Sequence, residues 1–201
     1  MRRFQFLALL VVSLFTTNLS AQQPGQPGSI PFRPPFPNQG PAKPDTPEAI
    51  AEFNVIYDLL QSAFSNPIEE SVRQVAAFSK KYPDTAAAYA LLGELKYIQF
   101  QMAGGCGMSD EVVMLAQKAI MTNQRSAEGY TLAAKAALCN RNAAWYRFAD
   151  NALAIAPNKP EALYVKARVL EQQGDYKESE VFFRRTLDLM KTPHRKSNIF
   201  R

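Results

Sequence analysis

Few residues in this chain have the types and spacing that catalysis requires. The only histidine, His194, lies near the C-terminus, and neither Cys106 nor Cys139 has a histidine close by, so a catalytic thiol or a zinc site has little support. The acidic pairs Glu69-Glu70 and Asp110-Glu111 fall in the first turns of expected helices, where carboxylates favourably oppose the helix dipole. Nucleophile elbows, phosphate loops and metal-spaced clusters are absent from the sequence. The sequence therefore predicts a protein that is not an enzyme and has no catalytic residue, metal or cofactor.

The N-terminus predicts export from the cytoplasm. Two arginines precede an apolar run over residues 4–15, and small residues follow up to Ala21. This arrangement is typical of a secretory signal peptide covering residues 1–21. An uncleaved anchor is the alternative, but a spanning helix needs about 20 apolar residues. We therefore expect a periplasmic or secreted protein with no stable membrane insertion after cleavage.

Export would place the two cysteines in an oxidising compartment. An even number of cysteines in an oxidising compartment favours a disulfide, here between Cys106 and Cys139. Two buried free thiols are the alternative.

The charge balance argues against a nucleic-acid partner. The formal net charge is +5, and it falls to +3 when residues 1–21 are removed. Nucleic-acid binding needs a clustered basic face, whereas the only local concentration here is the C-terminal end, with a basic tail over 194–201. We therefore expect no nucleic acid among the partners.

Residues 22–47 form a predicted disordered linker. They contain nine of the chain's fourteen prolines together with glycine and glutamine, a composition that cannot bury a core and favours extended polyproline II. Within it, residues 30–37 place Pro31 and Pro34 in a PxxP spacing beside Arg33 and two phenylalanines. Such a segment could dock into an aromatic-lined groove. A plain spacer is the alternative interpretation.

The remainder, residues 48–193, has the periodicity of paired helices. Thr46-Pro47-Glu48 is a helix start with an N-cap, a proline at the first position and an acid in the first turn. Asp175 is a second expected N-cap, with Glu178 three residues on. Apolar residues at helical spacing and turn residues between them predict hairpins over about 48–82, 86–122, 127–157 and 160–191.

The hairpins repeat with a period of about 33 residues. Glu128-Gly129-Tyr130 aligns with Glu161-Ala162-Leu163, and Gly93, Ala134 and Ala167 occupy one equivalent small-residue position. In these features, and in Gly174, Tyr176, Phe182 and Phe183 of the last hairpin, the chain resembles the tetratricopeptide repeat (TPR) family. It departs from the pattern at Lys166, Ser179 and Thr186. The resemblance implies an all-α superhelical solenoid of about four hairpins with a concave inner surface.

The resemblance also implies a function. In TPR proteins the first helix of each hairpin lines the groove, so the chain is expected to be a non-catalytic scaffold or adaptor that binds a protein or peptide there. A small-molecule or glycan-binding protein that uses the same groove is the alternative. The expected groove residues are Glu94, Tyr97, Thr131, Lys135, Tyr164, Arg168 and Glu171.

Two further expectations depend on the repeat arrangement. Cys106 lies in a glycine-rich loop at the far end of one hairpin and Cys139 ends the first helix of the next, so a bridge would pin that loop to its neighbour. The last hairpin lacks a polar closing helix, which solenoids need for solubility. Self-association through this uncapped C-terminal repeat is therefore a further expectation.

Overall fold

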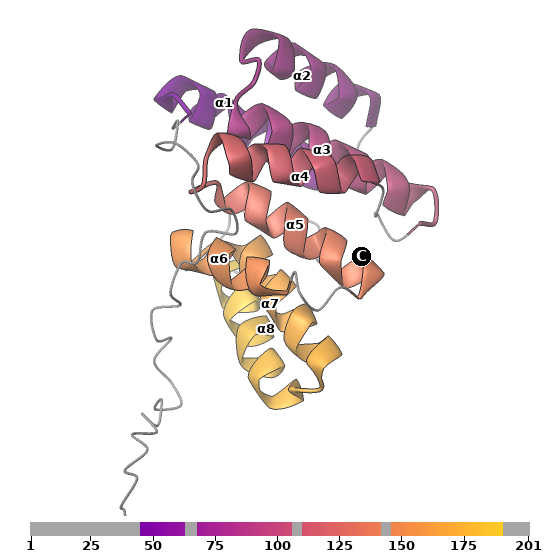
Figure 1. The fold of residues 1–201 in the computed structure, drawn as a ribbon, viewed down its shortest axis with the longest axis vertical. Helices are drawn as coiled ribbons and strands as arrows, with labels where there is room; N and C mark the ends of the chain where they lie inside the picture. The colour runs from indigo at the N-terminus through magenta and orange to yellow at the C-terminus, as the bar shows by residue number, and fades with distance from the viewer. Residues whose placement is uncertain (1–44, 63–67, 106–109, 142–145, 191–201) are drawn as a thin grey trace, which may run out of the picture.

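The computed structural model describes residues 45–62, 68–105, 110–141 and 146–190 (Figure 1). Within these ranges the chain forms eight α-helices and no β-strand, which confirms the predicted all-helical fold. The predicted signal peptide, most of the proline-rich linker and the basic tail lie outside the described residues. None of the described helices is both long and apolar enough to cross a membrane.

The eight helices follow one another in pairs. Their bounds are α1 Pro47–Gln61, α2 Ile68–Lys81, α3 Ala86–Met102, α4 Asp110–Thr122, α5 Ala127–Asn140, α6 Arg147–Ile155, α7 Pro160–Gln173 and α8 Tyr176–Met190.

Short polar side chains fix several helix starts, because they satisfy backbone N–H groups that have no partner inside the helix. Thr46 Oγ1 accepts a hydrogen bond from the Ala49 N–H at 3.2 Å, and Asp175 Oδ1 accepts one from the Glu178 N–H at 3.2 Å. Both predicted caps are therefore confirmed. Asn66 and Ser109, which precede α2 and α4, lie outside the described residues.

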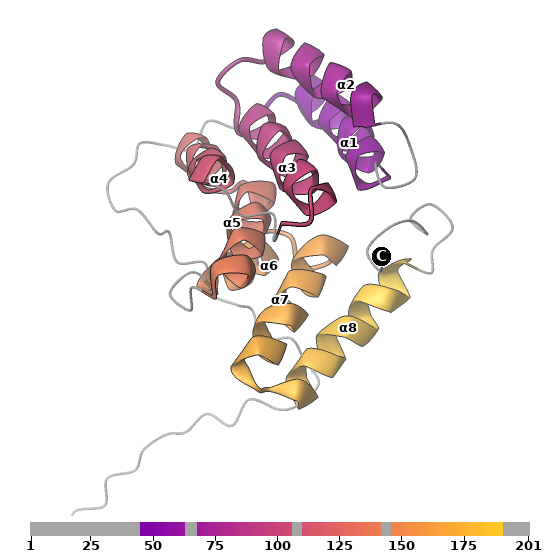
Figure 2. The same cartoon turned by 90° about the vertical axis from the view of Figure 1, so that its right-hand side faces the viewer.

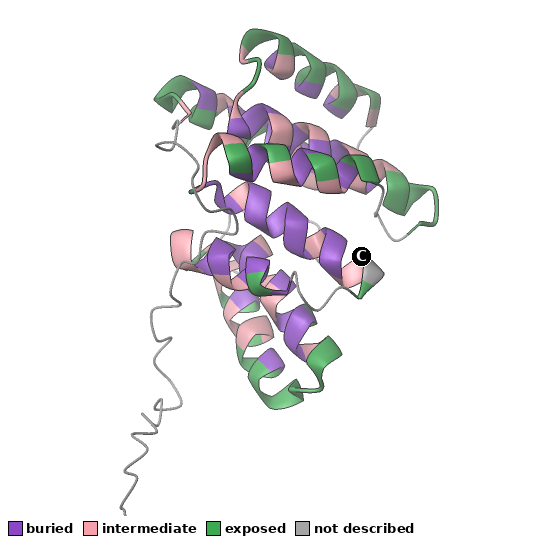
Figure 3. Ribbon diagram, viewed as in Figure 1, coloured by how far each residue is buried: buried purple, intermediate pink, exposed green. Residues whose placement is uncertain are grey.

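The odd-numbered helices form the inside of the molecule. Helix α3 contacts α1, α2, α4 and α5, and α5 in turn contacts α7, so successive odd helices lie against one another. The views in Figures 1 and 2 agree that the pairs succeed one another in chain order, from α1 and α2 at one end to α7 and α8 at the other. Buried positions concentrate on α3, α5 and α7, whereas the outer sides of α2 and α8 are exposed (Figure 3).

Small residues allow the central helices to approach closely. A Cβ atom added at Gly93 would lie 2.2 Å from Leu132 Cδ2, and one added at Gly129 would lie 3.0 Å from Ala119 Cβ. The α3–α5 and α4–α5 contacts therefore use the space that these glycines leave free.

The last hairpin is packed less completely. Leu170 on α7 is buried, Phe182 and Phe183 on α8 are half-buried, and Leu187 is 42% exposed. Val181 and Tyr176 are more exposed still. These side chains lie on the C-terminal repeat through which the sequence predicts self-association, and that self-association stays a prediction.

Candidate functional site

The odd-numbered helices present a continuous row of polar and aromatic side chains, which we call the inner stripe. It consists of Gln61, Glu94, Tyr97, Gln101, Lys135, Tyr164, Arg168 and Glu171. Within each helix the members are three, four or seven residues apart, which places them on one helical face. Six of the seven residues that the sequence predicts for the groove are members, and the seventh is Thr131.

An ion pair at the centre of the inner stripe joins three helices. Lys135 Nζ on α5 lies 2.5 Å from Glu94 Oε1 on α3, and the two side chains are only 11% and 4% exposed. Gln61 Nε2 at the end of α1 donates to the same carboxylate oxygen at 3.0 Å. Because each charge already has its counter-charge, this pair links hairpins rather than offering a free charge to a ligand.

Tyr97 lies directly beside this pair. Lys135 Nζ is 5.3 Å from the centroid of the Tyr97 ring, and Gln101 Nε2 donates to the Tyr97 hydroxyl at 2.9 Å. Burial raises the pKa of Tyr97, the charge of Glu94 and the hydroxyl of Tyr164 raise it further, and the charge of Arg168 lowers it. The hydroxyl is therefore neutral at physiological pH. The effect of Tyr164 and Arg168 on this pKa also indicates that these α7 residues lie near Tyr97.

The α7 part of the inner stripe is its most accessible part. Arg168 Nη1 lies 3.2 Å from Glu171 Oε2, and both side chains are more than two-fifths exposed. The ring of Tyr164 makes an edge contact with that of Phe183, with centroids 5.9 Å apart. Together these side chains offer a cation, a carboxylate and two aromatic rings to a ligand.

Thr131 does not contribute to this surface. It is fully buried, and its hydroxyl donates to the carbonyl of Ala127 at 2.7 Å. The structure therefore brings Glu94, Tyr97, Lys135, Tyr164, Arg168 and Glu171 together but leaves Thr131 inside the core.

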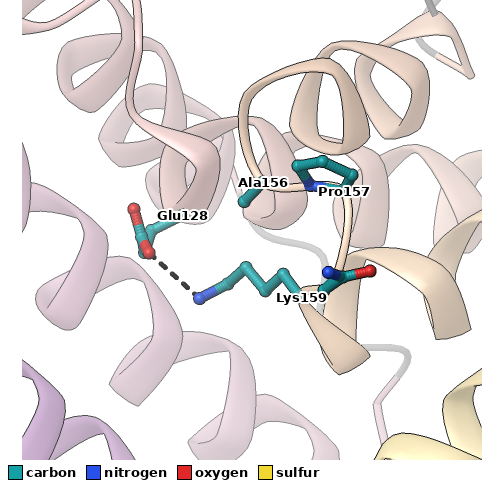
Figure 4. Close-up of a pocket in the computed structure, with 5 residues that line it drawn as sticks. Glu128, Ala156, Pro157 and Lys159 are labelled. Atoms are coloured by element: carbon teal, nitrogen blue, oxygen red, sulfur yellow. Dashed lines mark hydrogen bonds and ion pairs between the residues drawn. The ribbon is translucent and has the colours of Figure 1, made fainter. Parts of the chain in front are cut away.

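A second cluster lies at the other end of the inner stripe, near the N-terminal ends of α3, α5 and α7. Lys159 Nζ lies 3.0 Å from Glu128 Oε1 on α5 and 5.1 Å from the ring centroid of Tyr57 on α1. A cavity of about 350 Å³ adjoins them, lined by Glu128, Lys159 and the turn residues 156–158 (Figure 4). We call Asp45, Tyr57, Glu128 and Lys159 the head of the stripe.

Asp45 connects the head to the proline-rich linker. Its Oδ1 accepts a hydrogen bond from the Ala87 N–H in the first turn of α3, at 3.3 Å. Burial raises the pKa of Asp45, the hydrogen bond from Ala87 lowers it, and the nearby charge of Glu128 raises it again. The linker therefore enters the folded region beside the head.

Sequence reasoning missed the head of the stripe. Lys159 and Glu128 are 31 residues apart, close to the repeat period, and both stand at helix starts. That spacing was the available signal, but the contact of Lys159 with Tyr57 joins hairpins that are not sequence neighbours. No local pattern encodes it.

Only one of the two cysteines of the predicted disulfide lies within the described residues. Cys139 is half-buried near the end of α5 and is not a free thiol, whereas Cys106 lies outside the described residues. The pairing stays a prediction. Across the described ranges no group of three or more histidine, cysteine, aspartate or glutamate residues is arranged to hold a metal ion.

No protein-family model matches this chain, and no curated protein matches it. The resemblance to TPR proteins therefore depends on the repeat pattern in the sequence alone.

Proposed function

We propose that the protein is an exported, non-catalytic helical-repeat scaffold of the TPR type that binds a protein or peptide along its inner stripe. The observation that carries the proposal is that α3, α5 and α7 bring aromatic and charged side chains onto one face. Tyr164 and Arg168 on α7 lie near enough to Tyr97 on α3 to change its pKa, so residues of two different hairpins meet on this face. Arginine and tyrosine are the residue types that most often dominate the energy of protein interfaces.

The shape of the inner stripe favours an extended ligand. It runs from the head, where α3, α5 and α7 begin, to Gln101 and Glu171 near their ends. A helix of 14 residues is about 21 Å long. An extended peptide of six or seven residues covers that length at about 3.3 Å per residue.

The cavity at the head favours the alternative, a small-molecule or glycan ligand. Its volume is about 350 Å³, but it is largely open to solvent, whereas ligand pockets bury most of the surface of their ligand. In addition, the one cation among its lining residues, Lys159, is already paired with Glu128. We therefore keep the peptide scaffold as the first proposal.

The test is capture of envelope proteins by immobilised native protein and two charge-reversal variants. Arg168→Glu places a repelling charge on the inner stripe. Arg184→Glu makes the same change on α8, where the side chain is 75% exposed and pairs with Glu180 in its own helix. We expect one stoichiometric partner that Arg168→Glu loses by at least about tenfold and Arg184→Glu retains, because an unfavourable interface charge costs well over about 1.4 kcal/mol.

Equal capture by all three proteins would contradict the inner stripe as the binding surface. If no protein is captured and a glycan or metabolite raises the melting temperature instead, the alternative function replaces the scaffold. Circular dichroism of both variants verifies that each remains folded.

A further inference from the structure

We infer that the chain's own proline-rich segment, residues 30–37, binds along the inner stripe of the same molecule and competes there with the external partner. The inference rests on the proposed function, because it assigns an occupant to the same surface. It follows from the charges of the inner stripe, from its aromatic side chains and from the point where the linker joins the fold.

The charged groups of the inner stripe mostly neutralise one another. Glu94 and Lys135 form a buried pair, and Arg168 and Glu171 form an accessible one. A strongly acidic or basic ligand would have to separate these pairs. A nearly neutral segment does not, and residues 30–37 carry a single charge, on Arg33.

The aromatic side chains suit a polyproline II ligand. Proline-rich segments bind in this conformation to surfaces lined by aromatic rings, with little entropic cost because the conformation is already populated. Tyr97, Tyr164 and Phe183 supply such rings. The Tyr97 hydroxyl accepts its hydrogen bond from Gln101 and keeps its own proton, which a ligand carbonyl can accept.

The segment combines the matching groups. Pro31, Pro34 and Pro35 can pack on aromatic rings, and Phe32 and Phe36 add apolar area.

The linker joins the fold at the right place and is long enough. Asp45 is bonded to Ala87, and Tyr97 lies ten residues further along α3, about 15 Å away along the helix axis. Asp45 is eight positions beyond Pro37, a stretch that can span about 26 Å when extended. Residues 30–37 can therefore reach the aromatic part of the inner stripe while running antiparallel to the odd helices.

The first test is competition by a synthetic peptide with the sequence of residues 28–39, labelled for fluorescence anisotropy. It is titrated into the native protein, into a segment variant (Pro31→Ala, Phe32→Ala, Pro34→Ala, Phe36→Ala) and into a matched control variant (Pro24→Ala, Pro27→Ala). A tethered ligand acts at an effective concentration in the millimolar range. We therefore expect the peptide to bind the segment variant about tenfold more tightly than it binds the native protein or the control variant.

The second test locates the contact. A photo-crosslinking amino acid is placed at Phe36 or, as control, at Gln22, and the crosslinked peptides are identified by mass spectrometry. We expect Phe36 to crosslink within one molecule to α3 or α7, and Tyr164→Ala to reduce this product severalfold. Crosslinks that form only between molecules, or that are the same from both positions, would overturn the inference.

The outcomes separate this inference from the proposed function. Equal peptide affinity for all three proteins, or no binding to any, overturns the segment as occupant, whereas loss of the captured partner in Arg168→Glu would still support the scaffold. If the peptide binds as expected and no partner is captured, the segment stays the occupant of the inner stripe, whereas the external partner and the competition with it are overturned.

Discussion

Helices α5 and α8 have nearly the same length, 14 and 15 residues, but bury very different sets of side chains. Most of α5 is buried, including Tyr130, Leu132 and five alanines. On α8 only Ser179 and Thr186 are buried. The cause is position, because α5 packs against α3, α4, α6 and α7 while α8 packs mainly against α7. Within the described residues, α5 has a neighbouring hairpin on either side, whereas α8, the last described helix, contacts mainly its own hairpin partner.

The two helices also solve their packing in different ways. Helix α5 uses small apolar residues that let its neighbours approach closely. Helix α8 uses hydroxyls at its two buried positions: Ser179 Oγ donates to the Ala167 carbonyl at 2.9 Å, and Thr186 Oγ1 donates to the Phe182 carbonyl at 2.9 Å. Both residues are positions where the sequence departs from the TPR pattern. The Ser179 hydroxyl joins α8 to α7, whereas the Thr186 hydroxyl bonds within α8.

The sharpest test of the comparison is to truncate one leucine in each helix. Leu132→Ala should lower the free energy of unfolding by about 3 kcal/mol, because it removes a fully buried side chain and leaves a cavity against Gly93. Leu187→Ala, at a position 42% exposed, should change it by less than about 0.5 kcal/mol. Urea unfolding of both variants gives the two values. Similar losses would show that α8 is covered in solution.

Gly93 and Gly174, which lie in different hairpins, provide a second, smaller contrast. Gly93→Ala should cost about 2 kcal/mol, since its Cβ would lie 2.2 Å from Leu132 Cδ2 and the leucine must move within a packed core. Gly174→Ala meets no atom within 4 Å but has a φ of +83°, so it should cost about 1 kcal/mol through backbone strain alone. In the double variant Gly93→Ala, Leu132→Ala the added Cβ no longer meets the leucine side chain. The loss of the double variant should therefore be smaller than the sum of the two single losses.

Removing the Ser179 hydroxyl tests what holds α8 against α7. Ser179→Ala should lower the free energy of unfolding by about 1 kcal/mol, because the hydrogen bond to Ala167 is lost within a buried contact. Lys177→Ala on the exposed side of the same helix is the control and should be neutral within about 0.5 kcal/mol. If thermal unfolding cannot distinguish the two variants, this hydrogen bond does not hold α8 to α7.

The smallest expected effect concerns the other end of the repeat region, where Asp45 docks on α3. Its pKa is raised above 3.8 in the folded state, so its contribution to stability is present below that pH and is lost as the pH rises through the folded-state pKa. Asp45→Asn keeps the acceptor for Ala87 and removes this loss. We expect a gain of a few tenths of a kcal/mol at pH 7 and none at pH 3, since half-exposed charges are screened. A loss at pH 7 would show that the charge itself stabilises the contact.

The sequence was sufficient for the helices and for much of the inner stripe, because both depend on local periodicity. Thr46 and Asp175 cap helices as expected, and Glu94, Tyr97 and Lys135 lie on one surface. The partners of each side chain were not predictable, since they depend on how far neighbouring helices are rotated about their axes. That rotation turns Thr131 into the core, although it lies only four residues from Lys135.

Lys159 has a consequence for the order of folding. Most helix contacts join neighbours in the chain, and such local topologies fold fast. The contact of Lys159 with Tyr57 spans 102 residues and can form only after the hairpins between them are in place. Its removal should therefore accelerate unfolding and leave the refolding rate unchanged, as expected for an interaction absent from the transition state. Lys159 would then slow the unfolding of the helical hairpins without affecting how fast they fold.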